Sequence, residues 1–145
     1  MVIDHIGIAV RSIEQAISLW RGAFGYDQAT EIVVNTRQRV RVVFLERTGS
    51  LPVKLIEPTD ATSPLRAFTE RGGGLHHLCF RVESLDPEIA RLAAMGMRVI
   101  TPPEPGEAFQ GDPIAFLYAG GGLNIELIDT TRRAGRLVRE PDAAL

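Results

Sequence analysis

The stretch His5-Ile-Gly-Ile-Ala-Val10 has a counterpart 72 positions later in the chain, His77-Leu-Cys-Phe-Arg-Val82. In both stretches an apolar residue occupies every second position, which is the pattern of a β-strand with one buried face. Three further pairs of segments share this offset: Ser12–Ile17 with Ser84–Ile89, Val42–Leu45 with Ile114–Leu117, and Val53–Glu57 with Ile125–Asp129. A single offset, with no insertion between the segments, indicates an internal repeat that covers most of the chain.

Each copy of the repeat is predicted to be a βαβββ unit. The first strand leads into a helix, over Ser12–Phe24 in the first copy and Ser84–Met95 in the second. Ser12 and Gln15 form a capping box at the start of the first helix, and Gly25 suits a left-handed cap at its end. Three more strands follow in each copy, at Thr30–Val34, Val40–Glu46 and Leu51–Glu57 and at Arg98–Thr101, Pro113–Tyr118 and Leu123–Asp129. The predicted fold class is α+β, with two tandem βαβββ units forming a curved, mainly antiparallel eight-stranded sheet around a cleft and the helices outside.

The chain length of 145 residues fits a single domain, 1–145. We expect the first unit to span 1–58, a connecting segment to span 59–74, and the second unit to span 75–130. The remaining tail, 131–145, is rich in arginine and weakly apolar. We expect this tail to be poorly ordered or to pack late in folding.

Composition argues against several classes of partner. The net charge is −2, with both signs scattered along the chain, which argues against nucleic acid or an anionic membrane as the main partner. No stretch approaches the roughly 20 apolar residues of a membrane-spanning helix, and the N-terminus does not resemble a signal peptide. The single cysteine, Cys79, cannot form an internal disulfide, so a reducing, cytoplasmic location is expected.

Strand alternation predicts where four polar side chains point. If the apolar residues of the first strand pack beneath the helix, His5 must face the opposite side of the sheet. The repeat gives His77 the same direction, and it gives Lys54 and Glu126 equivalent places in the last strand of each unit. If the two copies curl about a shared pseudo-twofold axis, these four side chains converge on one concave surface.

The three potential ligands among these side chains indicate a metal site. Two imidazoles and a carboxylate suit a divalent ion with open positions for a substrate, so His5, His77 and Glu126 are the predicted metal ligands. A single histidine in an alternating strand is more often an ordinary half-buried residue, and the symmetric placement is what favours a metal. A carboxylate in an apolar strand needs a partner, which for Glu126 is a metal ion, Lys54 or solvent.

Lys54 can act in more than one way beside this site. At about 4 Å and an effective dielectric near 20, a dication and a monocation repel by roughly 8 kcal/mol. The ion is therefore expected to bind weakly or to be absent, unless Lys54 extends to solvent. Paired with Glu126, Lys54 takes the place of the cation and can bind a substrate carboxylate or stabilise an oxyanion. Glu126 and Lys54 are the predicted catalytic residues.

The floor of the cleft is expected to be apolar, which favours a small organic substrate over a polymer. Its predicted residues are Val42, Phe44, Ile114 and Phe116. His76 has the strand parity of the helix side and is expected to be structural. Cys79 has the parity of the cleft, where a small buried thiol is a commoner role than a nucleophile.

Four motifs resemble the vicinal oxygen chelate superfamily of glyoxalases, bleomycin-resistance proteins and dioxygenases. They are Asp4–Val10, Ser63-Pro64, Gly74-Leu-His-His-Leu78 and Asn124–Leu127, in a resemblance that spans Ile3 to Ile128. The Gly-Leu-His-His run preceded by Ser-Pro is most similar to methylmalonyl-CoA epimerases. The resemblance implies a homodimer, an acyl thioester as substrate, and a divalent metal ion held at the positions of His5, Lys54, His77 and Glu126.

Two positions depart from the epimerase pattern. The family usually has Gln or Glu where this chain has Lys54, and one of its two proton-transferring carboxylates falls near Val42, which cannot carry a proton. The resemblance implies a glyoxalase- or epimerase-like isomerase or lyase, with proton transfer or isomerisation next to a thioester or carbonyl. Lys54 and Val42 count against the epimerase reaction itself. The alternative is a metal-free protein that binds a small molecule, for resistance or as an accessory protein in a biosynthetic pathway.

Overall fold

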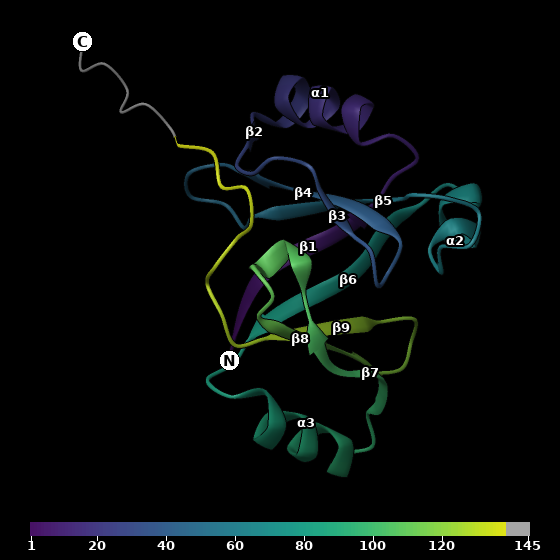
Figure 1. The fold of residues 1–145 in the computed structure, drawn as a ribbon, viewed down its shortest axis with the longest axis vertical. Coiled ribbons are helices and arrows are strands. Elements are labelled where there is room, and N and C mark those ends of the chain that lie inside the picture. Colours follow the sequence, from purple (N-terminus) through teal and green to yellow (C-terminus); the bar gives the residue numbers. More distant parts are fainter. Residues whose placement is uncertain (139–145) are drawn as a thin grey trace.

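The computed structural model describes residues 1–138 (Figure 1). Within this range nine strands form one curved mixed sheet. The strands are β1 Val2–Ala9, β2 Asp27–Gln28, β3 Val33–Asn35, β4 Val40–Glu46, β5 Val53–Pro58, β6 Gly74–Arg81, β7 Arg98–Pro105, β8 Pro113–Tyr118 and β9 Asn124–Ile128. The helices are α1 Ile13–Phe24, α2 Arg66–Glu70 and α3 Leu85–Ala94, with a 3-10 turn, η1, at Glu107–Phe109. The predicted α+β class is confirmed.

The centre of the sheet is built from the first and last strands of the two units. The strand order is β2-β4-β5-β1-β6-β9-β8-β7, with β3 also paired to β4. β1 and β6 pair antiparallel with each other, and each has a parallel neighbour on its outer side, β5 beside β1 and β9 beside β6. The two units therefore meet through equivalent strands, and the four central strands are those that carry the predicted site residues.

The second strand of the first unit differs from the expected Thr30–Val34. Two short strands, β2 and β3, pair with β4 instead, so nine strands are found in residues 1–138 where eight were expected. Thr30 Oγ1 accepts a hydrogen bond from Phe44 N (3.1 Å), and Glu31 N donates to Gly135 O (2.8 Å). Thr30 thus contacts β4 through its side chain, while the backbone of Thr30 and Glu31 pairs with the C-terminal segment at Arg136 and Gly135.

The two long helices cover the outer face of the sheet, α1 over the first unit and α3 over the second (Figure 1). The predicted cap of α1 is confirmed: Ser12 Oγ accepts from Gln15 N (3.2 Å), and Gly25 closes the helix with φ 69°. One core cluster lies under each helix, and a third lies on the concave face, where it includes Val42, Phe44 and Ile114. No helix among residues 1–138 is long and apolar enough to cross a membrane.

The tail does not behave as expected over its first part. Residues 131–138 run from the second unit back to the loop between β2 and β3 in the first unit (yellow in Figure 1). Ala134 N donates to Ala108 O (2.9 Å) and Leu137 N donates to Ala29 O (2.9 Å). The expectation of poor order is therefore wrong for this part, because backbone hydrogen bonds attach it to both units. The remainder, 139–145, lies outside the described residues.

Candidate active site

The structure brings together the four polar side chains that the repeat places on one face. Glu126 lies at the centre, with its Oε2 3.1 Å from His5 Nε2 and 2.9 Å from His77 Nε2. Lys54 Nζ lies 3.3 and 3.4 Å from the two oxygens of Glu126. All four residues are buried, with at most 3% of their surface exposed. Lys54 therefore turns inward to the carboxylate and does not extend to solvent.

Gly7 makes room for His77 within this cluster. It faces Lys54 across the β1–β5 pairing and His77 across the β1–β6 pairing. A Cβ atom at position 7 would lie 2.1 Å from Cε1 of His77. A glycine at this position is what lets the imidazole lie against β1 and reach Glu126.

Gly7→Ala is expected to destabilise the protein by about 1–3 kcal/mol, the usual cost of overpacking a core, and to displace the His77 ring. Denaturant unfolding and the histidine side-chain NMR resonances measure the two effects. Gly22→Ala is the matched control, because a Cβ there meets nothing within 4 Å and alanine favours the helix. Wild-type stability with unmoved His77 resonances in Gly7→Ala would contradict this packing.

A β-bulge precedes each of the two histidines. Asp4 is the extra residue of β1 between the Ile3 and His5 pairings, and His76 is the extra residue of β6 between Leu75 and His77. Asp4 and His76 are related by the repeat offset. Each bulge turns an extra side chain toward the neighbouring histidine. The expectation that His76 belongs to the helix side is wrong for this reason.

The bulge residues hold the imidazoles at their Nδ1 atoms. Asp4 Oδ2 lies 2.7 Å from His5 Nδ1, and His76 Nδ1 lies 2.8 Å from His77 Nδ1. The contact with Asp4 orients the His5 ring so that Nε2 faces the carboxylate of Glu126. Asp4 also accepts from Arg81 Nη1 (3.1 Å) and from Arg133 Nη2. Asp4 and Arg133 are site residues that the sequence patterns did not identify.

Burial and charge set the protonation of the central groups. Burial raises the pKa of Glu126, but the Lys54 ammonium and the imidazoles of His5 and His77 outweigh it and hold that pKa well below its usual range. Burial lowers the pKa of His77 to about 3, against the opposing pull of the Glu126 carboxylate. At neutral pH the site therefore contains an ionised carboxylate and a neutral His77 imidazole.

Cys79 lies beside the cluster without taking part in it. Its side chain is fully buried in β6, and its thiol lies close enough to Asp4 and His5 to join a possible ligand group with them. Burial raises the pKa of the Cys79 thiol well above its ordinary value, and the Glu126 charge adds to this effect. Because a thiolate is the ligand and the nucleophile, the neutral Cys79 serves as a packed small side chain.

Comparison with known proteins places the chain in a family. A family model described as the Glyoxalase/Bleomycin resistance protein/Dioxygenase superfamily matches residues 4–116. The chain belongs to this superfamily. It is 36% identical over 130 residues to the uncharacterized protein YqjC of Bacillus subtilis, which covers 88% of this chain and 91% of that protein.

Solved structures of epimerases share the fold of this superfamily member. Methylmalonyl-CoA epimerase from Mycobacterium tuberculosis is 30% identical, with a TM-score of 0.78 over 89% of this chain and 87% of that one. A methylmalonyl-CoA epimerase in complex with methylmalonyl-CoA and NH4+ is 28% identical, with a TM-score of 0.77 over 92% of this chain and 96% of that one. The resemblance to the epimerase branch is thereby confirmed at the level of fold and sequence.

Members of this superfamily typically use a divalent metal ion, and three side chains here fit one. His5, His77 and Glu126 offer ligand atoms that all lie within 4.8 Å of one another. His77 Nε2 lies near Glu126 Oε2 but not in hydrogen-bonding geometry, so this buried nitrogen has no hydrogen-bond partner among residues 1–138. A buried imidazole nitrogen without a partner suits a metal ligand. Lys54 does not fit as a fourth ligand, because an ammonium group is a cation and a donor only.

A pocket of about 240 Å³ lies next to the cluster and suits a small organic group. Its walls include Leu65, His76 and Phe116. The rings of His76 and Phe116 both meet His77 edge-on, at centroid distances of 5.1 and 5.5 Å. The pocket walls therefore contact the ring of His77, which lies beside the buried carboxylate of Glu126.

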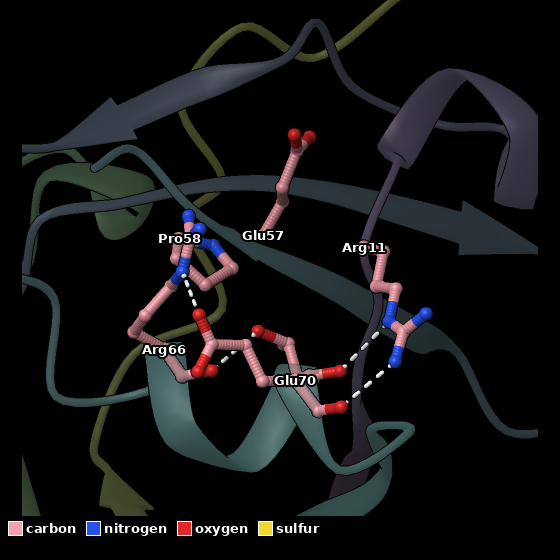
Figure 2. A pocket seen from close by; sticks show the side chains of 6 residues that line it. Arg11, Glu57, Pro58, Arg66 and Glu70 are labelled. Atoms are coloured by element: carbon pink, nitrogen blue, oxygen red, sulfur yellow. Dashed lines mark hydrogen bonds and ion pairs between the residues drawn. The ribbon is translucent and has the colours of Figure 1, made fainter. Parts of the chain in front are cut away.

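A larger pocket, of about 360 Å³, lies outside the site between β5 and α2 (Figure 2). Arg11 donates there to the backbone oxygens of Thr69 (3.0 Å) and Glu70 (2.8 Å). Arg66 pairs with the Glu70 side chain (2.7 Å). Figure 2 shows these groups turned to one another, with Arg66 paired to Glu70 and Arg11 held by backbone carbonyl oxygens.

Proposed function

We propose that this protein is an epimerase- or isomerase-like enzyme that transfers a proton at the carbon next to the carbonyl of an acyl thioester. The observation that carries the proposal is the fully buried carboxylate Glu126, held between Lys54, His5 and His77. Relatives of known activity in the same superfamily are methylmalonyl-CoA epimerases, and they support this class of reaction.

Glu126 is the base in this proposal. A carboxylate that stays ionised within reach of the substrate can accept a proton from the carbon beside the carbonyl. Lys54 has three N–H donors, and its contacts with the two oxygens of Glu126 leave one for the carbonyl oxygen of the substrate. As negative charge grows on that oxygen, the buried ammonium stabilises it. Glu126 then returns the proton to the carbon.

A divalent ion, when bound, would be held by His5, His77 and Glu126 and would polarise the same carbonyl. One epimerase binds methylmalonyl-CoA together with NH4+, so an ammonium ion is compatible with bound substrate in that relative. In this chain Lys54 brings an ammonium group to the carboxylate through its own side chain. We therefore propose that Lys54 supplies positive charge at the carbonyl and that a metal ion binds weakly.

The resemblance to the epimerases implies a second proton-transferring carboxylate near the position of Val42. This chain has no carboxylate at that position, so Glu126 acts as a single base. Val42 is buried in the concave core beside Phe44 and cannot move a proton. A single base exchanges the proton on one face of the carbon, whereas inversion needs a donor on the opposite face. We therefore expect exchange of the proton with solvent to be faster than inversion of configuration.

Proton exchange in heavy water tests the proposed function. Methylmalonyl-CoA is incubated with the protein in D2O, with and without Co2+, and NMR follows the loss of the proton beside the carbonyl. The expected result is loss faster than in an enzyme-free control, with inversion slower than exchange. No exchange above the control in either condition would rule the function out.

The cell compartment and the assembly are part of the same proposal. The only cysteine is a buried free thiol, as expected for a reducing compartment, and we place the enzyme in the cytoplasm. A homodimer is proposed from the superfamily resemblance. Light scattering measures the mass in solution, and a monomer would contradict the proposed assembly.

A further inference from the structure

A third pocket, of about 320 Å³, lies between the first residues of β1 and the C-terminal segment that follows β9. Lys54, His77 and Glu126 are not among its walls, so it is separate from the catalytic cluster. Its charged walls are three arginines and two carboxylates, and we call it the arginine pocket. These residues are Arg81, Arg133, Arg136, Asp4 and Glu46.

The charges of the arginine pocket do not balance. Three guanidinium groups share two carboxylates, and Asp4 is also in contact with His5 Nδ1 (2.7 Å). Asp4 accepts from Arg81 Nη1 (3.1 Å) and from Arg133 Nη2, so its one negative charge serves three neighbouring groups. The walls therefore carry an excess of positive charge, which favours an anion.

Arg133 is the arginine of this pocket whose hydrogen bonds are incomplete. Only 8% of its side chain is exposed, and its Nη1 is buried without a hydrogen-bond partner among residues 1–138. Nη1 shares the guanidinium carbon with Nη2, which contacts Asp4 in the pocket wall, so Nη1 lies beside the same space. A buried donor of this kind costs free energy unless an acceptor satisfies it. An oxygen of an anionic ligand would be that acceptor.

Aromatic and backbone contacts fix the guanidinium of Arg133 at the pocket wall. Its carbon lies 4.3 Å from the centroid of Phe44 and 5.1 Å from that of Phe109. Gln110 Nε2 donates to the Arg133 backbone oxygen (3.1 Å). Lys54 Nζ of the catalytic cluster lies 5.9 and 5.1 Å from the same two centroids, so the aromatic pair borders both cations. Because Arg133 is already held in place, little side-chain freedom is lost when it binds a ligand.

Arg136 can supply a second donor to the same ligand. It pairs with Glu46 through one contact of 3.1 Å, in which the two side chains are 56% and 30% exposed. Ion pairs this exposed contribute little to stability, so Arg136 can turn to a ligand without losing a strong contact. The planar fork of a guanidinium group matches two oxygens of a phosphate.

We propose that the arginine pocket is an anion site that binds a phosphate group, with Arg133 Nη1 as its fixed donor and Arg136 as its second. Phosphate suits the pocket better than a carboxylate does, because its oxygens do not lie in one plane and can meet guanidinium groups from separate segments. The inference goes beyond the proposed function and does not depend on it. Asp4 contacts both Arg133 and His5, so an occupied pocket is expected to change the surroundings of His5.

NMR titration with inorganic phosphate tests the site. The chain has three histidines, so ring-labelled histidine gives one set of signals for each. The expected result is a saturable shift of the His5 signals at least threefold larger than that of His76, which lies in the wall of a different pocket. Sodium chloride at the same pH and ionic strength should not produce it. No saturable shift, or the same shift in chloride, would overturn the proposal.

Variants of the pocket should change the phosphate affinity in opposite directions. Arg133→Met is expected to weaken binding at least tenfold, and Arg133→Lys to recover part of the loss. Glu46→Gln is expected to tighten binding at least threefold, because Arg136 loses a competing partner, and a damaged fold would not produce this gain. Arg132→Met is the matched control, because Arg132 pairs with Asp112 at the surface (2.7 Å). Unchanged affinity in Arg133→Met or in Glu46→Gln would contradict the site.

The phosphate can be a free ion or part of a larger molecule such as coenzyme A. Repeating the titration with coenzyme A present separates these sources. If the pocket takes a phosphate of coenzyme A, phosphate affinity should fall at least tenfold in the wild type. If it takes a free ion, the affinity should stay within twofold. Both results require the saturable phosphate binding described above.

Discussion

Glu126→Gln is expected to slow proton exchange by about 10²- to 10⁴-fold, the range that loss of a general base covers. Glutamine keeps the size of the side chain and one acceptor oxygen, but it cannot take up a proton. Asp4, the other buried carboxylate beside the site, is already engaged by His5, Arg81 and Arg133. Exchange of methylmalonyl-CoA in D2O measures the effect.

The change also removes the partner of a buried cation. Lys54 is 3% exposed, and breaking a buried pair on one side typically costs about 3–5 kcal/mol. Glu126→Gln is therefore expected to melt at a lower temperature than the wild type. The double variant Glu126→Gln/Lys54→Met removes both charges and should recover stability without recovering exchange. Wild-type exchange in folded Glu126→Gln would show that Glu126 is not the base.

Chelator treatment separates the contributions of the ion and of the ammonium. If a bound ion polarises the substrate carbonyl, chelation of the wild type should lower the exchange rate as Glu126→Gln does. If Lys54 supplies the charge, chelation should leave the rate unchanged, and Lys54→Met should lower it instead. The two outcomes distinguish the mechanisms without a change of substrate.

The sequence repeat was enough to predict the centre of the site. A constant offset makes β1 equivalent to β6 and β5 equivalent to β9, and strand parity then selects one face of each. This placed His5 with His77 and Lys54 with Glu126, and the structure brings all four side chains together. The prediction worked because a shift of one residue in any of these strands would turn its apolar side chains out of the core.

The surrounding layer could not be predicted in this way. Asp4 and His76 are extra residues at bulges, and a bulge interrupts the parity from which side-chain direction is inferred. Arg133 lies in a segment without periodicity, held by backbone hydrogen bonds to distant loops. Phe109, which borders both cations, belongs to a short 3-10 turn. The one sequence feature that pointed to these residues was the repeat offset, which pairs Asp4 with His76. Each of the two directly precedes a site histidine in the sequence.

Lys54 stands where the superfamily resemblance implies a Gln or Glu metal ligand, and it is the only lysine of the sequence. Its Nζ contacts both oxygens of Glu126, so a metal ion must compete with the ammonium for the same carboxylate. At about 4 Å and an effective dielectric near 20, the repulsion between a divalent ion and the ammonium is roughly 8 kcal/mol. Much of this repulsion is relieved if the Lys54 side chain moves away from Glu126, so the measured loss of metal affinity is smaller.

Lys54→Gln is therefore expected to tighten Co2+ binding at least 100-fold, which corresponds to about 2.7 kcal/mol. The substitution removes the competing cation and supplies an amide oxygen as a fourth ligand. Titration calorimetry and the visible absorption of Co2+ measure the affinity and the ligand set. Lys54→Met removes the charge without adding a ligand, so its Co2+ affinity should lie between those of the wild type and Lys54→Gln. Arg41→Gln is the control, because Arg41 pairs with Glu14 and Glu57 away from the site.

The single lysine gives this experiment a direct readout in the wild-type protein. Isotope-labelled lysine yields one side-chain NMR signal, which comes from Lys54 alone. If the ion displaces the ammonium from Glu126, this signal should shift as Co2+ or Zn2+ is added. The midpoint of the shift should match the midpoint of the calorimetric titration. A signal that stays in place while the ion binds would locate the ion elsewhere. An affinity in Lys54→Gln within twofold of the wild type, or weaker, would mean that the ammonium does not compete for the site.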